Sequence, residues 1–151
     1  MIKTLSKSEA KELQQQIKTA YNIEVIGKKD IVQENPDNKS IYINNELAFF
    51  SVEDRIVPTL KLILKNNFLK KITVDMGAVK FIVGGADVMR PGIVEIDDGI
   101  AAEDFVVVQD VNNKKPLAVG RALFNAEEMQ AMKTGKVLKN IHYVGDEIWK
   151  A

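Results

Sequence analysis

The chain has 151 residues, of which 46% are hydrophobic and 28% are charged, and its 21 basic side chains balance 21 acidic ones. This composition excludes an intrinsically disordered protein, because disorder goes with low hydrophobicity and high net charge. The chain has no cysteine, which excludes a disulfide scaffold, thiolate catalysis and the common zinc-finger sites. A net charge of zero also argues against a protein that coats nucleic acid non-specifically, so any nucleic-acid contact would need a local patch.

Residues 7–20 are predicted to form an amphipathic helix, because Ser6 and Glu9 have the spacing of a capping box and apolar side chains follow at helical intervals. A second helix is predicted to begin after Arg55, with Pro58 in its first turn, where proline is tolerated. Short strands separated by turn residues are predicted between the two helices, at 23–26, 30–33, 40–43 and 47–52. The first half of the chain is thus expected to be a small α/β domain.

A change of pattern at residues 66–71 predicts a boundary between two domains, 1–71 and 72–151. No flexible Gly/Ser linker lies there, so we expect two packed domains rather than two loosely tethered ones. Residues 1–71 contain 12 basic and 9 acidic side chains, a net charge of +3, and residues 72–151 contain 9 and 12, a net charge of −3. The two halves therefore differ only modestly in charge.

The second half is predicted to combine short strands with two short helices. The strands are expected at 72–74, 88–96, 105–108, 117–123, 141–144 and 148–149, and the helices at 76–83 and after Asn125. Six short strands with turn signals suggest a small closed or nearly closed barrel, with Trp149 in the last strand closing its core. The predicted fold class is therefore α+β, a small α/β domain packed on a six-stranded barrel.

Residues that usually carry out catalysis are scarce in this chain. His142 is the only histidine and lies in an apolar strand pattern, which favours a hydrogen-bonded structural role. The acidic pairs 97–98, 103–104 and 127–128 are adjacent in sequence, so in strands their side chains would point to opposite faces. No phosphate-loop, dinucleotide-binding or zinc-protease motif occurs. We therefore expect a protein that is not an enzyme, without catalytic residues, a metal site or a cofactor.

The sequence gives no sign of contact with a membrane. It contains no run of about 18 apolar residues, the length needed to span a bilayer. Its first residues lack the apolar core of a signal peptide. We expect a cytoplasmic location.

One segment, residues 80–92, combines three glycines within nine residues with two isolated basic side chains, Lys80 and Arg90. Glycine allows a second backbone to approach closely, as a phosphodiester chain would, and the two cations would supply the charge. The alternative is a helix end at Gly84-Gly85 and a tight turn at Pro91-Gly92, with two ordinary surface cations. Spacing and composition leave both interpretations open.

The same segment resembles a PUA domain, the RNA-binding module named for pseudouridine synthases and archaeosine transglycosylases. The matching residues are 74–80, 84–93, 119–122 and 140–143. Together with 58–62 and the ending 145–149, they resemble the malignant T-cell-amplified-sequence family and its archaeal relatives. That family pairs a small N-terminal pre-PUA domain, here 1–71, with a C-terminal PUA pseudobarrel, here 72–151.

The resemblance implies RNA binding by the short helix and the glycine-containing loop after it. By position, the contacts would come from Lys80, Gly84, Gly85, Ala86, Met89, Arg90, Pro91 and Gly92. It further implies a translation initiation or recycling factor that contacts rRNA of the small subunit or tRNA, with a protein partner carrying an SUI-type domain. The alternatives are a targeting subunit for an RNA-modifying enzyme and a ribosome-biogenesis factor.

Overall fold

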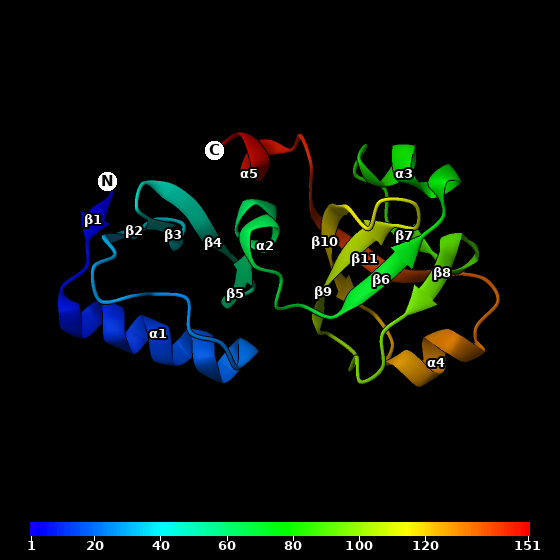
Figure 1. The fold of residues 1–151 in the computed structure, drawn as a ribbon, viewed down its shortest axis with the longest axis horizontal. Helices are drawn as coiled ribbons and strands as arrows, with labels where there is room; N and C mark the ends of the chain where they lie inside the picture. Colours follow the sequence, from blue (N-terminus) through cyan, green and yellow to red (C-terminus); the bar gives the residue numbers. More distant parts are fainter. The chain divides into compact units, whose positions relative to one another are not determined.

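The computed structural model covers residues 1–151, and the chain divides into two compact units, Met1–Phe68 and Leu69–Ala151. Each unit is described by itself, with its elements labelled in Figure 1. In the first unit these are β1 (Lys3–Thr4), α1 (Lys7–Tyr21), β2 (Val32–Asn35), β3 (Ser40–Ile43), β4 (Glu46–Val52), β5 (Arg55–Pro58) and α2 (Leu60–Lys65). The five strands form one antiparallel sheet in the order of the sequence. No helix of either unit is long and apolar enough to cross a membrane.

Helix α1 confirms the helix predicted for residues 7–20. The Ser6 hydroxyl accepts a hydrogen bond from the backbone N–H of Glu9, and the Glu9 carboxylate accepts one from the backbone N–H of Ser6. Both bonds satisfy donors that a helix N-terminus otherwise leaves unpaired. Leu13 and Ile17 are buried, and they pack with Phe49 into the core of this unit.

The strand predicted for residues 23–26 is wrong. This segment has no partner strand and is held instead by the side chain of Gln14. The Gln14 amide donates to the carbonyl of Ile23 (3.0 Å), and its oxygen accepts from the backbone N–H groups of Val25 and Ile26 (2.9 and 2.8 Å). The apolar alternation resembles a strand, but a helix side chain replaces the neighbouring backbone as hydrogen-bond partner.

The helix predicted to begin after Arg55 is also partly wrong. Residues Arg55–Pro58 form β5, the last strand of the sheet, and helix α2 begins after Thr59, whose hydroxyl caps Leu62 N–H (3.3 Å). Pro58 has no N–H to give to a ladder, which confines proline to edge strands such as this one. The buried side chain of Val57 therefore belongs to a strand.

The second unit is built on a nearly closed six-stranded sheet, which confirms the predicted pseudobarrel. Its elements are β6 (Lys71–Val74), α3 (Met76–Ile82), β7 (Val88–Met89), η1 (Arg90–Gly92), β8 (Ile93–Ile96), β9 (Phe105–Asp110), β10 (Pro116–Ala122), α4 (Ala126–Ala131), β11 (Lys136–Tyr143) and α5 (Glu147–Lys150). The strand order is β7-β11-β10-β9-β6-β8, with only the β6–β9 pair parallel. Its core is aliphatic and includes Ile72, Val106 and Met129. Figure 1 shows α3 and α4 at opposite ends of this sheet.

Within the strand-like stretch predicted at 88–96, the strand after Pro91-Gly92 is β8, and the 3₁₀ turn η1 separates it from the short strand β7. One prediction for this unit is wrong. The final strand predicted at 148–149 is a short helix, α5, whose N-cap is Asp146. The Asp146 carboxylate accepts from the backbone N–H of Trp149 (2.8 Å), which starts a helix turn. Trp149 is therefore not a strand residue that closes the barrel core.

His142 is fully buried in β11, and its Nδ1–H donates to both carboxylate oxygens of Asp146 (2.9 Å each). Burial lowers the pKa of His142, although the Asp146 carboxylate opposes that shift. Below the unfolded pKa of about 6.5, protons therefore bind preferentially to the unfolded chain. This contribution to stability is complete above that pH and is lost as the pH falls toward the lower folded pKa.

We expect the free energy of unfolding to decline between about pH 6.5 and pH 5, before most carboxylates titrate. In His142→Asn, whose amide can still donate to Asp146, this decline should be absent even though the variant is less stable overall. Urea unfolding of both proteins across this pH range measures the slope. An equal slope in the variant would assign the pH dependence to other groups.

Candidate nucleic-acid interface

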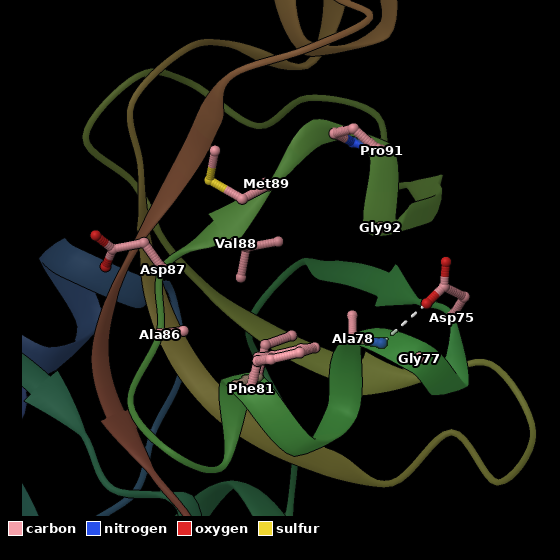
Figure 2. Close-up of a pocket in the computed structure, with 11 residues that line it drawn as sticks. Asp75, Gly77, Ala78, Phe81, Ala86, Asp87, Val88, Met89, Pro91 and Gly92 are labelled. Atoms are coloured by element: carbon pink, nitrogen blue, oxygen red, sulfur yellow. Dashed lines mark hydrogen bonds between the residues drawn. The ribbon is translucent and has the colours of Figure 1, made fainter.

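Four of the eight residues predicted to bind RNA line an apolar pocket of about 460 Å³ in the second unit. The pocket is bordered by α3, the 84–87 loop, β7 and η1, which follow one another along the chain. Its lining residues are Asp75, Gly77, Ala78, Phe81, Ile82, Ala86, Asp87, Val88, Met89, Pro91 and Gly92. In Figure 2, Phe81 and Ala78 on α3 face Val88 on β7 across this space.

Helix α3 forms one wall and presents apolar side chains to solvent. Asp75 is its N-cap and accepts from the backbone N–H of Ala78 (3.0 Å), the bond drawn in Figure 2. Ile82 is buried in the barrel core, whereas Phe81 is 60% exposed and Met76 is 44% exposed. Met89 on the opposite wall is 50% exposed. Large apolar side chains open to solvent at and beside one concave surface are typical of binding sites, so this pocket is the candidate interface.

The 84–87 loop is held in place by β11, mainly through Asn140. The Asn140 side-chain amide donates to the carbonyls of Ile82 and Ala86 (3.0 Å each). The backbone N–H of Asn140 donates to the carboxylate of Asp87 (2.8 Å). These three bonds tie the end of α3 and the last two residues of the loop to a barrel strand, which limits how far the loop can change shape.

Two glycines allow close approaches around the pocket. Gly85 has a φ of +96°, and a Cβ there would lie 3.1 Å from Cε1 of Tyr143, so the loop backbone packs directly on that ring. Gly92 brings η1 against α3, because its carbonyl accepts from Asp75 N–H (2.9 Å) and a Cβ would lie 3.2 Å from that of Ala78.

Arg90 reaches back into the barrel rather than into the pocket. Its Nε–H donates to the carbonyl of Met129 (2.7 Å), and its Nη1 donates to the carbonyl of Ile93 (3.3 Å). Its own backbone N–H donates to Gly135 (2.8 Å). The guanidinium therefore joins η1 to the end of α4, and two of its five N–H donors are already used.

The charge around the pocket comes from α3 and β11. Lys80 is exposed and has no carboxylate within ion-pairing distance, and its Nζ lies 5.1 Å from the ring centroid of Phe81. Asp87 is paired with Lys136 (2.9 Å). Burial opposes ionisation of Asp87, but the hydrogen bonds from Asn140 and Lys136 outweigh it and lower its pKa. Lys139 contributes further positive charge.

The structure brings the predicted residues together only in part. Ala86, Met89, Pro91 and Gly92 line the pocket. Gly84 and Gly85 shape the loop behind it, Lys80 lies on the exposed face of α3, and the side chain of Arg90 points to α4.

Sequence reasoning missed several residues of this site. Phe81, Asp87 and Asn140 are the main ones. The exposed Phe81 had a local signal, since an aromatic residue beside Lys80 is a usual pair for stacking and charge. Asn140 had none, because its two bonds span more than 50 residues of sequence.

The groups at this site are apolar walls, one aromatic ring and one unpaired lysine, which can contact a nucleobase and a phosphate. Nowhere in the chain do three His, Cys, Asp or Glu side chains cluster in a way that could hold a metal ion.

Two family models match the chain. Residues 70–144 match the PUA domain, and residues 3–66 match a domain of unknown function, DUF1947. The PUA match contains the entire pocket described above.

Among similar proteins, an uncharacterized protein of Methanocaldococcus jannaschii is 45% identical over 96% of this chain and 93% of its own length. Translation machinery-associated protein 20 of Schizosaccharomyces pombe is 34% identical over 72% of this chain and 63% of its own length. Malignant T-cell-amplified sequence 1-B of Xenopus laevis is 33% identical over 83% of this chain and 74% of its own length.

Solved structures of other proteins are similar to this chain over all or part of its length. The crystal structure of a hypothetical protein of Pyrococcus horikoshii matches this chain with a TM-score of 0.82 and 33% identity. The match covers 99% of this chain and 98% of the other chain. A chain in the structure of an H/ACA ribonucleoprotein bound to a substrate RNA matches with a TM-score of 0.52 and 25% identity. This match covers 64% of the present chain and 29% of the other chain.

Proposed function

We propose that this chain, which belongs to the family of the malignant T-cell-amplified-sequence proteins and translation machinery-associated protein 20, is a translation factor without enzymatic activity. Its target in this proposal is rRNA of the small ribosomal subunit or tRNA, during initiation or recycling. The proposal also includes a protein partner with an SUI-type domain, which rests on the family resemblance alone.

The observation that carries the proposal is the apolar pocket between α3 and η1, with Lys80 unpaired at its side. Bases inside a duplex are stacked and paired, so they cannot enter a concave pocket, whereas an unpaired base can be splayed out into one. Phe81 offers a ring for stacking, and Lys80 offers a charge for the adjoining phosphate. The site therefore suits a single-stranded RNA segment, such as the acceptor end of a tRNA.

The deciding experiment compares RNAs that differ only in the single-stranded end. The purified chain is titrated with an acceptor-stem hairpin that has an unpaired 3′ end, with the blunt version of the same hairpin, and with isolated 30S subunits in sucrose gradients. We expect binding to the hairpin with the unpaired end or to 30S subunits. Equal binding to the blunt hairpin, without co-sedimentation, would contradict the proposal.

Lys80→Glu is expected to weaken RNA binding through the phosphate contact. If the ammonium neutralises one phosphate, the slope of log affinity against log salt should fall by about one unit. Discrimination between the unpaired and blunt hairpins should persist, since the pocket is intact. Phe81→Ser is the matched variant, because it should remove that discrimination while leaving the salt slope unchanged. Affinities at several salt concentrations separate the two contributions.

A second candidate function is a targeting subunit for an RNA-modifying enzyme. It is favoured by the match to an H/ACA ribonucleoprotein structure that holds a substrate RNA. A ribosome-biogenesis factor is a related alternative. Crosslinking in cells distinguishes the three, because small-subunit rRNA of free 30S particles or tRNA supports translation, modification-guide RNA supports targeting, and precursor rRNA supports biogenesis.

A further inference from the structure

A groove of about 500 Å³ in the first unit lies between α1 and the segment that leads into β2. Its lining residues are Thr4, Leu5, Ser6, Lys7, Ala10, Lys11, Gln14, Ile26, Gly27, Lys28, Asp30, Ile31 and Val32. Leu5, Ala10 and Ile26 are continuous with the core of the unit, while Ile31 is 56% exposed. The groove thus has an aliphatic floor that opens to solvent.

The walls of the groove are fixed by hydrogen bonds. Gln14 ties the 23–26 segment to α1, as described above. Asp30 closes the turn that follows this segment, because its carboxylate accepts a hydrogen bond from Gly27 N–H (2.7 Å). The same carboxylate accepts a second hydrogen bond from the Asn44 amide (2.9 Å). The Asn44 oxygen in turn accepts from Ile31 N–H (2.9 Å). A groove with fixed walls loses little conformational entropy on binding.

The lysines of this unit divide into two groups by location. Those away from the groove have partners, as in the pairs Lys3–Glu9, Lys18–Glu24, Lys39–Asp54 and Lys65–Glu46, and Lys61 is also engaged. Those at the groove, Lys7, Lys11, Lys28 and the adjoining Lys29, are exposed and have no carboxylate within 4.0 Å.

The carboxylate of Asp30 offsets only part of this positive charge. Its two oxygens accept hydrogen bonds from neutral donors, the Gly27 N–H within its turn and the Asn44 amide from further along the chain. Hydrogen bonds, first that from Gly27 N–H and then that from Asn44, lower its pKa. Three lysines and this one aspartate line the groove, so the charge of its lining is positive on balance.

We propose that this groove binds a segment of a partner protein in which acidic residues flank aliphatic side chains. The aliphatic anchors would fill the floor beside Ile31, and the carboxylates would meet Lys11 and Lys28 at the rim. Charge complementarity favours an acidic partner. No aromatic or arginine side chain lines the groove, which disfavours single-stranded RNA, because such grooves stack bases on aromatic rings.

The test is a selection from a displayed library of random 12-residue peptides, with the chain of both units immobilised as the target. Enriched peptides are then measured against Lys11→Glu/Lys28→Glu and against Lys18→Glu/Lys65→Glu, which changes the net charge equally but away from the groove. Ile31→Asp is a second variant at an exposed position, so it tests the floor without disturbing the core. The oligonucleotides r(U)12 and r(A)12 are titrated in parallel, and melting temperatures confirm folding.

We expect enriched peptides that are acidic with aliphatic anchors, and a loss of affinity of about tenfold or more in both groove variants but not in the control. Binding of the acceptor-stem hairpin should be unchanged in all variants, since it concerns the other unit. No enrichment, peptides without acidic bias, or equal binding to the groove variants would overturn the proposal. So would oligonucleotide binding that is lost only in Lys11→Glu/Lys28→Glu, because the occupant would then be RNA.

Discussion

Gly85→Val is expected to weaken RNA binding while leaving the second unit folded. Gly85 has a φ of +96°, a region that β-branched residues avoid at a cost of about 1–3 kcal/mol. A valine Cβ would also lie 3.1–3.2 Å from two ring carbons and the hydroxyl oxygen of Tyr143. Because Asn140 fixes the loop on both sides of Gly85, the strain must move the pocket wall. We expect an affinity loss of about tenfold or more, measured with the unpaired hairpin.

Gly145→Val is the matched control. Gly145 has a φ of +95°, so its backbone strain is nearly the same, but no atom lies within 4 Å of its added Cβ. We expect both variants to lose stability, with the larger loss in Gly85→Val, and only Gly85→Val to lose RNA. Equal RNA affinity in the two variants would show that the 84–87 loop merely shapes a turn.

Arg90→Ala is expected to lower the free energy of unfolding by about 2–3 kcal/mol, because hydrogen bonds to charged groups contribute about 1.5–3 kcal/mol each. The carbonyl of Met129 would lose a 2.7 Å bond and that of Ile93 would lose a weaker one. The salt slope of RNA binding should also fall by about one unit if the remaining guanidinium donors contact phosphate. Urea unfolding and RNA titrations measure the two effects separately.

Arg90→Lys separates these roles, since lysine keeps the charge but lacks the guanidinium fork. We expect it to be nearly as unstable as Arg90→Ala while retaining most of the salt slope. If both variants keep the wild-type slope, Arg90 is structural only, and the phosphate contact belongs to Lys80 alone. If both keep wild-type stability, the bonds to Met129 and Ile93 contribute nothing.

Sequence alone determined the features that depend on neighbouring residues. The capping box of Ser6 and Glu9 fixed the start of α1, and Asn125 with Glu128 did the same for α4. Apolar alternation predicted most barrel strands, and the run from Lys80 to Gly92 marked the RNA-binding module through its resemblance to a PUA domain. These are local rules, in which a short spacing suffices to satisfy backbone donors or bury one face.

Only the tertiary structure determined which hydrogen-bond partners residues 23–26, Arg90 and the 84–87 loop have. Residues 23–26 alternate like a strand, but Gln14 supplies their hydrogen bonds from a helix. The sequence predicts Arg90 to be an isolated basic side chain. The fold instead places the carbonyl of Met129, 39 residues away, 2.7 Å from its Nε. The 84–87 loop beside the apolar pocket is likewise bonded to Asn140 of β11, more than 50 residues further along the chain. Such bonds depend on where distant segments meet, and the spacing of residues along the chain carries no information about that.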